Sequence, residues 1–288
     1  LHLLSRRQRQ MCIRDRENTM QKVIYLDQIT DFATNMEPSI VAYIAEGLVE
    51  TYESFNTHSI VAFDWQDLTD ETSKPSQVLI YIDHDDLFYI CENEAAYTAA
   101  KKCFVSAKTN EYAMYLFFKN LLRGSTKYLE GLEEQVSQLD DDVSDGTKNE
   151  LRETITRIRI KINRTKKYYD QLDFLFGELC DNDNLLISEN CLRYFEILRN
   201  RTVRLSSQSM YLWEYIHQVR ESYQSQIEIE QNNLMKVFTM VTSIFLPLTL
   251  IVDWYGMNFQ MPELKWRYGY PFLIAVCILV SAIWYIIF

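Results

Sequence analysis

Residues 237–258 read VFTMVTSIFLPLTLIVDWYGMN, and residues 237–252 within them carry no charged side chain. A helix needs ~17 to 25 apolar residues to cross a bilayer, so this stretch is close to the lower limit. A second uncharged stretch, PFLIAVCILVSAIWYIIF, covers residues 271–288. Aromatic residues typical of a membrane interface flank both stretches: Trp254, Tyr255, Trp266, Tyr268 and Tyr270. We predict membrane spans at 237–254 and 271–288; the alternative is two buried helices of a soluble core.

A polar seam runs along the chain towards and into the first predicted span. Alternating steps of four and three residues select one face of a helix, because a 3.5-residue repeat follows a single line along it. The selected positions are Glu214, Gln218, Glu221, Ser225, Glu228, Asn232, Met235, Thr239, Thr242, Leu246, Thr249 and Asp253. Unsatisfied polar groups facing hydrocarbon are costly, so the seam should face water.

One chain with two spans cannot enclose an aqueous path by itself. Several first spans around an axis can do so, with the seams inward and the second spans outside, facing lipid. We therefore predict a homo-oligomeric pore lined by Asn232, Met235, Thr239, Thr242, Leu246, Thr249 and Asp253. Neighbouring apolar positions such as Ile216, Val219, Phe238 and Phe245 suit packing against partner helices or lipid.

A simpler interpretation of the seam exists. Threonine hydroxyls often bond back to carbonyls of their own helix, and Glu214, Glu221 and Glu228 would then form an ordinary solvated face. The unbroken register that ends at Asp253 favours the pore.

The part of the chain before residue 109 predicts a small α/β domain over residues 20–108. Short β-branched and aromatic runs at 23–26, 60–63, 78–82 and 87–91 indicate strands. The last two runs flank residues 83–86, DHDD, and predict a hairpin. A helix is expected over about 38–54.

Residues 109–233 predict long helices that form a stalk or funnel, followed by the pore region 234–288. Apolar residues from Tyr115 to Leu139 recur at spacings of three and four, a second helical run covers about 148–179, and a third starts near Ser188. The stretch 140–146, DDDVSDG, is predicted to form the turn between the first two. A single helix over 190–254 would be on the order of 100 Å long, too long for a compact monomer.

Composition excludes several classes of function. The net charge of -11 argues against a nucleic-acid partner, which usually requires a basic face. Six scattered cysteines predict neither a disulfide framework nor a zinc site, and they suit a reducing compartment. The sequence contains no phosphate-binding glycine loop or nucleophile elbow, so we expect no enzymatic activity and no nucleotide partner.

Residues 1–19, LHLLSRRQRQMCIRDRENT, do not match the pattern of the remaining chain. They lack the apolar core of a signal peptide and resemble read-through of a sequencing adapter before a start at Met20, so we expect a non-native leader. Without a signal peptide, the large domain should lie in the cytoplasm. A two-span hairpin then places both termini on the cytoplasmic side of a bacterial inner membrane.

The motif Tyr255-Gly256-Met257-Asn258 resembles the signature of the CorA magnesium-transporter family, whose Gly-Met-Asn follows the first span. The similarity extends over residues 231–236, 244–250, 261–266 and 269–271. The resemblance implies a cytoplasmic α/β domain, a helical funnel and a homopentamer in the lipid bilayer. It also implies passive, gated uptake of hydrated Mg2+, with Co2+ or Ni2+ as further ions and Mg2+ also as a regulator.

The resemblance also suggests residue roles. Asn258 would bind the hydration shell of incoming Mg2+, while Gly256 and Met257 would hold its loop. Asn232 would form a polar ring, and Met235 and Leu246 would form apolar constrictions that gate the pore. The outer loop Met261, Pro262, Glu263 and Leu264 favours magnesium over zinc.

Asp253 departs from the family pattern, which commonly has a small residue at this position. Carboxylates from neighbouring subunits would repel one another there unless a cation were bound, so we predict a metal site at Asp253 beside that at Asn258. The sequence also ends at Phe288 without the run of lysines usual in the family. Acidic candidates for regulation, none assigned, are Asp83, Asp85, Asp86, Asp140, Asp142, Asp145 and Glu196.

Two other functions remain open from the sequence. One is a zinc transporter of the same superfamily. The other is a membrane-anchored coiled-coil scaffold that conducts no ions.

Overall fold

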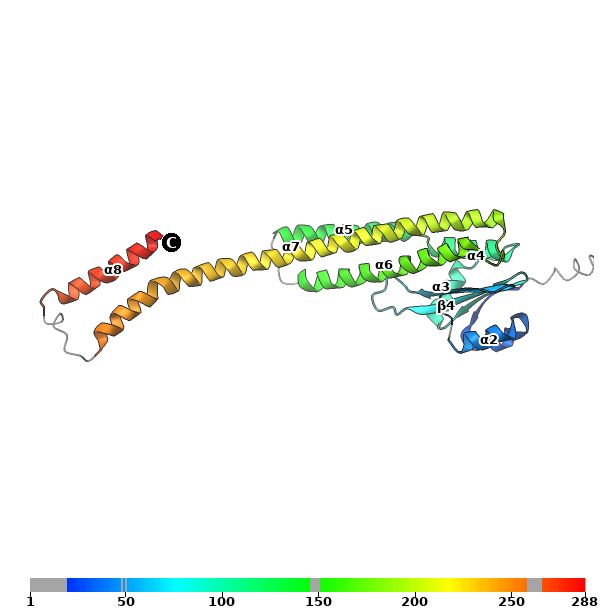
Figure 1. The fold of residues 1–288 in the computed structure, drawn as a ribbon, viewed down its shortest axis with the longest axis horizontal. Coiled ribbons are helices and arrows are strands. Elements are labelled where there is room, and N and C mark those ends of the chain that lie inside the picture. Colours follow the sequence, from blue (N-terminus) through cyan, green and yellow to red (C-terminus); the bar gives the residue numbers. More distant parts are fainter. Residues whose placement is uncertain (1–19, 48, 50, 146–150, 258–265, 288) are drawn as a thin grey trace, which may run out of the picture. The chain divides into compact units, whose positions relative to one another are not determined.

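The computed structural model describes residues 20–47, 49, 51–145, 151–257 and 266–287 (Figure 1). It divides into two compact units, the first ending at Val219 and the second starting at Arg220.

The first unit contains one five-stranded sheet with the order β1-β5-β4-β3-β2. Its strands are β1 (Met20–Tyr25), β2 (Tyr52–Ser54), β3 (His58–Trp65), β4 (Ser76–Asp83) and β5 (Asp86–Cys91). Strand β1 runs parallel to β5, and the other neighbours are antiparallel. The predicted hairpin at residues 83–86 is confirmed, since β4 pairs with β5 directly across it.

Side chains alternate between the two faces of the sheet, as the two-residue period of a strand requires. Ile60, Tyr81 and Phe88 pack on one face with residues of the 3-10 helix η1 (Leu26–Asn35) and of α2 (Pro38–Ala45). On the other face, the rings of Phe63 and Tyr89 contact Phe117 of α4 (Asn110–Leu121) at centroid distances of 6.5 and 4.4 Å. The sheet is thus covered on both sides, which confirms the predicted α/β domain.

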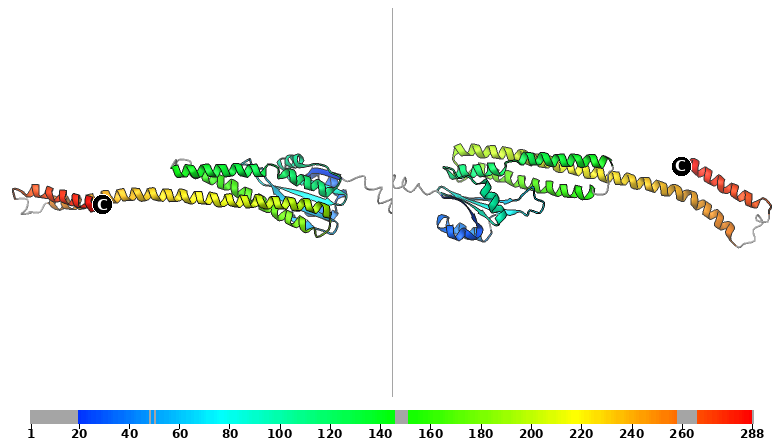
Figure 2. Two further views of the ribbon diagram at one scale, coloured as in Figure 1. Left: turned by 90° about the horizontal axis from the view of Figure 1, so that it is seen from above. Right: turned by 180° about the vertical axis from the view of Figure 1, so that it is seen from behind.

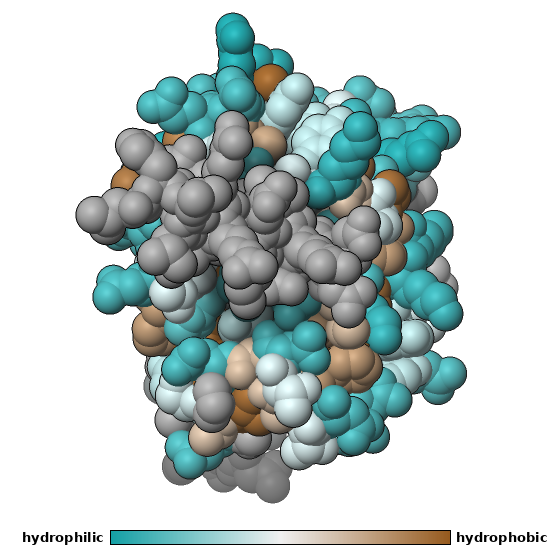
Figure 3. All heavy atoms as spheres, turned by 90° about the vertical axis from the view of Figure 1, so that its right-hand side faces the viewer, coloured by the Kyte–Doolittle hydropathy of each residue, from teal (hydrophilic) through white to brown (hydrophobic). Residues whose placement is uncertain are grey.

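Three long helices lie side by side in the first unit: α5 (Ser125–Asp145), α6 (Leu151–Asp181) and the first part of α7 (Glu189–Gly256) (Figures 1 and 2). The shorter α3 (Glu94–Cys103) precedes α4. The predicted apolar spacing is confirmed in α5, where Leu129, Leu132, Val136 and Leu139 are buried. The end of this unit seen in Figure 3 carries mainly hydrophilic side chains, with small separate hydrophobic areas.

Two local predictions are wrong. The helix expected over 38–54 ends at Ala45, and Gly47 follows at φ 68, a conformation that stops helices. The chain then forms β2, because Tyr52 pairs with Val61 of β3. Residues 140–145 of the predicted turn lie in α5, since buried Leu139 and Val143 continue its apolar face, and Gly146 lies outside the described residues.

A further break was not expected in the apolar run from Tyr115 to Leu139. Helix α4 ends at Leu121 and α5 begins at Ser125. Gly124 lies between them at φ 86, in the left-handed region that favours glycine. The run is therefore two helices.

Helix α7 contains 68 residues without interruption, so the third helical run is the one long helix that the sequence allowed over 190–254. Pro247 lies inside it and removes one backbone donor, leaving the Ser243 carbonyl without its usual helical partner. Helix α8 (Gly269–Ile287) follows. Among the described residues, α7 is the one helix long and apolar enough to cross a membrane, and 269–283 form a shorter apolar helix.

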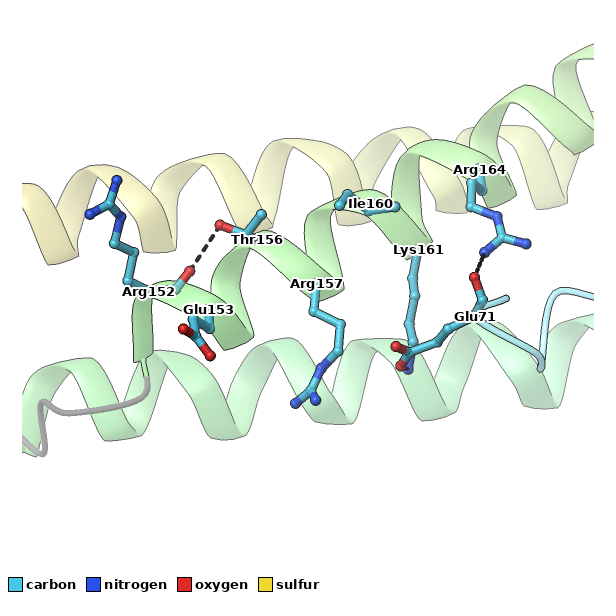
Figure 4. A pocket seen from close by; sticks show the side chains of 8 residues that line it. All are labelled: Glu71, Arg152, Glu153, Thr156, Arg157, Ile160, Lys161 and Arg164. Atoms are coloured by element: carbon cyan, nitrogen blue, oxygen red, sulfur yellow. Dashed lines mark hydrogen bonds and ion pairs between the residues drawn. The ribbon is translucent and has the colours of Figure 1, made fainter. Parts of the chain in front are cut away.

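The loop between β3 and β4 is fastened to α6 by Arg164 (Figure 4). Its guanidinium donates to the backbone carbonyls of Glu71 and Ser73, both at 2.7 Å, and of Asp70 at 3.3 Å. Lys161 adds an ion pair with the Glu71 carboxylate at 2.6 Å. These contacts, beside a cavity of 490 Å³, join the β3–β4 loop of the sheet to α6.

We predict that Arg164→Ala loosens this connection. Hydrogen bonds from a charged donor contribute about 1.5–3 kcal/mol when buried, and partial exposure here reduces this, so we expect a loss of roughly 1–2 kcal/mol. Thermal unfolding of the full chain in detergent, with limited proteolysis of the loop, measures the change. Arg193→Ala, at an exposed position on α7, is the control. Equal melting and equal loop cleavage in both variants would contradict the connection.

We also predict a pH-dependent stability that arises from His58, which is 6% exposed. Its Nδ1 lies 3.1 Å from the Thr57 hydroxyl, and its buried Nε2 has no hydrogen-bond partner among the described residues. Burial lowers the pKa of His58 below its ordinary 6.5, and the carboxylates of Glu37 and Asp83 oppose this only in part. The unfolded chain therefore binds a proton that the folded chain excludes, and stability falls as pH drops below about 6.5.

Denaturant unfolding at about pH 7.5 and about pH 5.5 measures this effect across the ordinary histidine range. His58→Phe should reduce the loss of stability on acidification, since Phe keeps the stacking on Phe55 and Tyr81 without a titrating group. His84→Gln, on the hairpin turn, should leave the loss unchanged. The same pH dependence in both variants would rule out His58 as its source.

Candidate functional site

In the first unit, the polar seam of α7 lies opposite its covered face. Leu212, Ile216 and Val219 are buried, with Ile216 0% exposed, whereas Glu214 and Gln218 are exposed. The seam therefore points away from the helices of its own chain. Ile216 and Val219, predicted to face partner helices or lipid, are instead buried within their own chain, because α7 packs here beside α5 and α6.

In the second unit, the seven candidate pore residues share one face of α7. At 3.6 residues per turn they fall within an arc of roughly 100°. All of them are exposed in the single chain: Asn232, Met235, Thr239, Thr242, Leu246, Thr249 and Asp253.

Beyond Val219, no residue of α7 is buried and most are exposed. Phe238 and Phe245 are exposed, and no residue of the most apolar 18-residue window of the helix is buried. Soluble monomers rarely expose a contiguous apolar surface of this extent. The helix therefore needs lipid, further copies of the chain or both to cover it.

The three threonines of the seam donate their hydroxyl protons to their own helix, as the simpler interpretation proposed. The hydroxyls of Thr239 and Thr249 donate to the carbonyls of Met235 and Phe245 at 2.8 Å, and Thr242 donates to Phe238. These bonds leave the lone pairs of each oxygen available. The exposed threonine surface therefore accepts hydrogen bonds, and the water shell of a cation donates them.

The end of α7 leads directly into the signature motif. Asp253 presents an exposed carboxylate, Tyr255 is half-buried and the helix ends at Gly256. Met257 is exposed. Asn258 and the outer-loop residues Met261, Pro262, Glu263 and Leu264 lie outside the described residues.

The acidic candidates at the β4–β5 hairpin serve local structure. Asp83 accepts hydrogen bonds from the backbone N–H groups of Asp85 and Asp86, at 2.8 and 2.6 Å, and from the Tyr81 hydroxyl at 2.8 Å. Asp86 accepts from the Met20 amide at 3.0 Å; burial nevertheless raises its pKa. No three acidic, histidine or cysteine side chains in the described part of the chain are grouped to hold a metal.

The fold and the site together define a class of protein: an α/β domain on long helices, one of which continues into an uncovered apolar segment with a polar seam. The sequence model of the CorA-like Mg2+ transporter protein family matches residues 30–288. The chain therefore belongs to this family.

Individual relatives agree with this assignment. The chain is 25% identical over 185 residues to the cobalt/magnesium transport protein CorA of Thermotoga maritima, covering 64% of this chain and 53% of that protein. It is 32% identical over 167 residues to the magnesium transport protein CorA of Haemophilus ducreyi, covering 57% and 48%. The matches thus span about half of each relative.

The fold is that of a solved transporter. The CorA magnesium transporter of Methanocaldococcus jannaschii superposes with a TM-score of 0.73 at 20% identity, over 94% of this chain and 90% of that one. This likeness confirms the predicted fold class.

We predict that Asp253→Asn weakens cation binding by the assembled protein. Removing a negative charge close to a divalent cation costs on the order of 1 kcal/mol per charge in watery surroundings, which corresponds to a several-fold loss of affinity. Binding of Mn2+, a paramagnetic substitute for Mg2+, can be measured by electron paramagnetic resonance. Glu221→Gln changes a seam carboxylate outside the predicted span and serves as control. Unchanged affinity in Asp253→Asn would exclude a cation site there.

Proposed function

We propose that this protein is one subunit of a homopentameric channel for passive, gated uptake of hydrated Mg2+, with Co2+ and Ni2+ as further ions. The observation that carries the proposal is the seam of α7. It is exposed opposite the covered face at Glu214 and Gln218, and it keeps its register to Asp253, directly before the signature motif. Membership in the CorA-like family supports the choice of ion.

The chemistry of the seam suits a hydrated cation. Magnesium releases its water reluctantly, so a channel that passes it with water attached avoids most of the dehydration cost. The waters of such an ion donate outward, and the seam threonines present acceptor oxygens. Asn258 at the outer end, with Tyr255, Gly256 and Met257 positioning the loop, would select the hydrated ion.

Closure of the channel would depend on the apolar members of the seam. Leu246 is 65% exposed in the single chain, and Met235 is also exposed. Rings of such side chains around an axis would exclude water and block ions. Asn232 would form a polar ring at the cytoplasmic end, and the membrane potential would drive ions inward when the rings separate.

The proposed pore also assigns a position to each remaining segment of the chain. We propose spans at 237–254 and 271–288 in a bacterial inner membrane, with the second span facing lipid and both termini cytoplasmic. The segments 20–108 and 109–233 would be the cytoplasmic α/β domain and the stalk. Mg2+ in the cytoplasm would regulate opening as well as being transported.

The decisive experiment compares two proteins in liposomes. The chain starting at Met20 should take up Mg2+ when an inside-negative potential is applied. Asn258→Ala should lower uptake by about tenfold or more, the change that about 1.4 kcal/mol of lost ion binding produces. Asn233→Ala, at a neighbouring amide outside the seam, is the matched control.

Three outcomes would contradict the proposal. Equal uptake by the native protein and Asn258→Ala would remove the role of the motif. Uptake of Zn2+ in preference to Mg2+ would favour the zinc transporter. Absence of ion flux from correctly assembled protein would favour the scaffold.

A further inference from the structure

A second candidate site lies in the first unit, separate from the seam. A cavity of 760 Å³ opens where the start of the β3–β4 loop, the end of α3, the α4–α5 connection and the middle of α6 meet. Its volume is within the range of ~300–1,000 Å³ typical of small-molecule sites. Its lining residues include Trp65, Lys102, Arg123, Tyr128 and Tyr168.

Hydrogen bonds between distant segments hold the walls of this cavity. The Asn120 amide donates to the Cys103 carbonyl at 3.0 Å and joins α4 to α3. The Tyr128 hydroxyl donates to the Leu68 carbonyl at 2.7 Å and joins α5 to the loop. The cavity is therefore formed before any ligand binds, which lowers the cost of binding.

The positive charge at this cavity is available to a ligand. Lys102 and Arg123 both line it, and neither forms an ion pair with another described residue. Helix α5, with 21 residues, begins at the cavity wall at Ser125. The free N–H groups and the dipole of a helix start favour an anion.

The largely buried side chain of Tyr168 adds an independent indication of a ligand. Tyr168 is 8% exposed and lines the cavity, and its hydroxyl makes no hydrogen bond among the described residues. Most side chains buried to this extent have their polar atoms paired, so the unpaired Tyr168 hydroxyl at the cavity is a donor that a ligand can use. Burial raises the pKa of Tyr168, so its hydroxyl stays protonated and can donate to an acceptor.

The one acidic side chain among the described lining residues is already occupied. Asp67 Oδ1 accepts from the backbone N–H of Thr69 at 2.9 Å and from its hydroxyl at 2.6 Å. Its charge is therefore held by the loop rather than offered to the cavity. The remaining free groups are two cations and a hydroxyl donor, beside aromatic rings.

We propose that this cavity binds a nucleoside phosphate. The phosphates would lie against Lys102, Arg123 and the start of α5, with the base against Trp65 and Tyr128. Inorganic phosphate alone would leave most of the cavity empty and would not contact the rings of Trp65 and Tyr128. The sequence predicted no nucleotide partner because it contains no contiguous phosphate-binding motif, whereas these residues come from separate segments that only the fold brings together.

Titration calorimetry on the full chain in detergent tests the proposal, with ADP as the probe and EDTA present to remove divalent cations. Lys102→Ala and Arg123→Ala should each weaken ADP binding by about tenfold, as expected for loss of a charge-assisted contact. Tyr168→Phe removes only the hydroxyl and should weaken it several-fold. Lys101→Ala, one position earlier on α3, should bind ADP like the native protein.

Inorganic phosphate and adenosine serve as partial probes, and each should bind more weakly than ADP. Three results would overturn the proposal: no ADP binding, phosphate binding as tight as that of ADP, or ADP binding unaffected by both Lys102→Ala and Arg123→Ala. Circular dichroism identifies any variant that fails to fold, and Tyr168→Phe then decides the question. None of these measurements depends on ion transport.

Discussion

The chain covers one face of its own helix α7, but this cover ends at Val219. Most other features of the structure depend on where it ends. Up to that residue, the buried side chains of α7 are part of an ordinary helical bundle. Beyond it, the helix continues to Gly256 with apolar side chains exposed on every side. Apolar surface left in water costs about 25 cal/mol per Å², so a helix of this length cannot remain uncovered.

The polar seam limits which surroundings can cover the exposed part of α7. Lipid suits Phe238 and Phe245 but not Asp253, because a carboxylate in hydrocarbon lacks a partner. An assembly that turns the seam inward satisfies both demands with one helix. The back-bonded threonines refine this argument, since their protons are used within the helix and only acceptor oxygens reach the surface. Such a surface favours species that donate hydrogen bonds, as hydrated cations do.

Different contacts hold the first unit together. Its sheet is covered on both faces, and Arg164 ties the β3–β4 loop to α6 through three backbone carbonyls. The same loop forms one wall of the cavity that carries Lys102 and Arg123. A ligand in that cavity would contact the loop, α3, α5 and α6 together. Such a ligand would therefore link the α/β domain to helices α5 and α6.

The sequence by itself determined the features that depend on neighbours along the chain. Short β-branched and aromatic runs predicted four of the strands. Helical spacing predicted the long helices and the seam, because this period is a property of the helical backbone. The sequence did not predict that Tyr52–Ser54 pair with β3, that residues 140–142 stay helical, or that Gly124 divides a continuous apolar run. Only the tertiary structure decided that Ile216 and Val219 are buried by their own chain, and that Lys102, Arg123 and Tyr168 line one cavity. Such contacts join residues far apart in the sequence, and no local period encodes them.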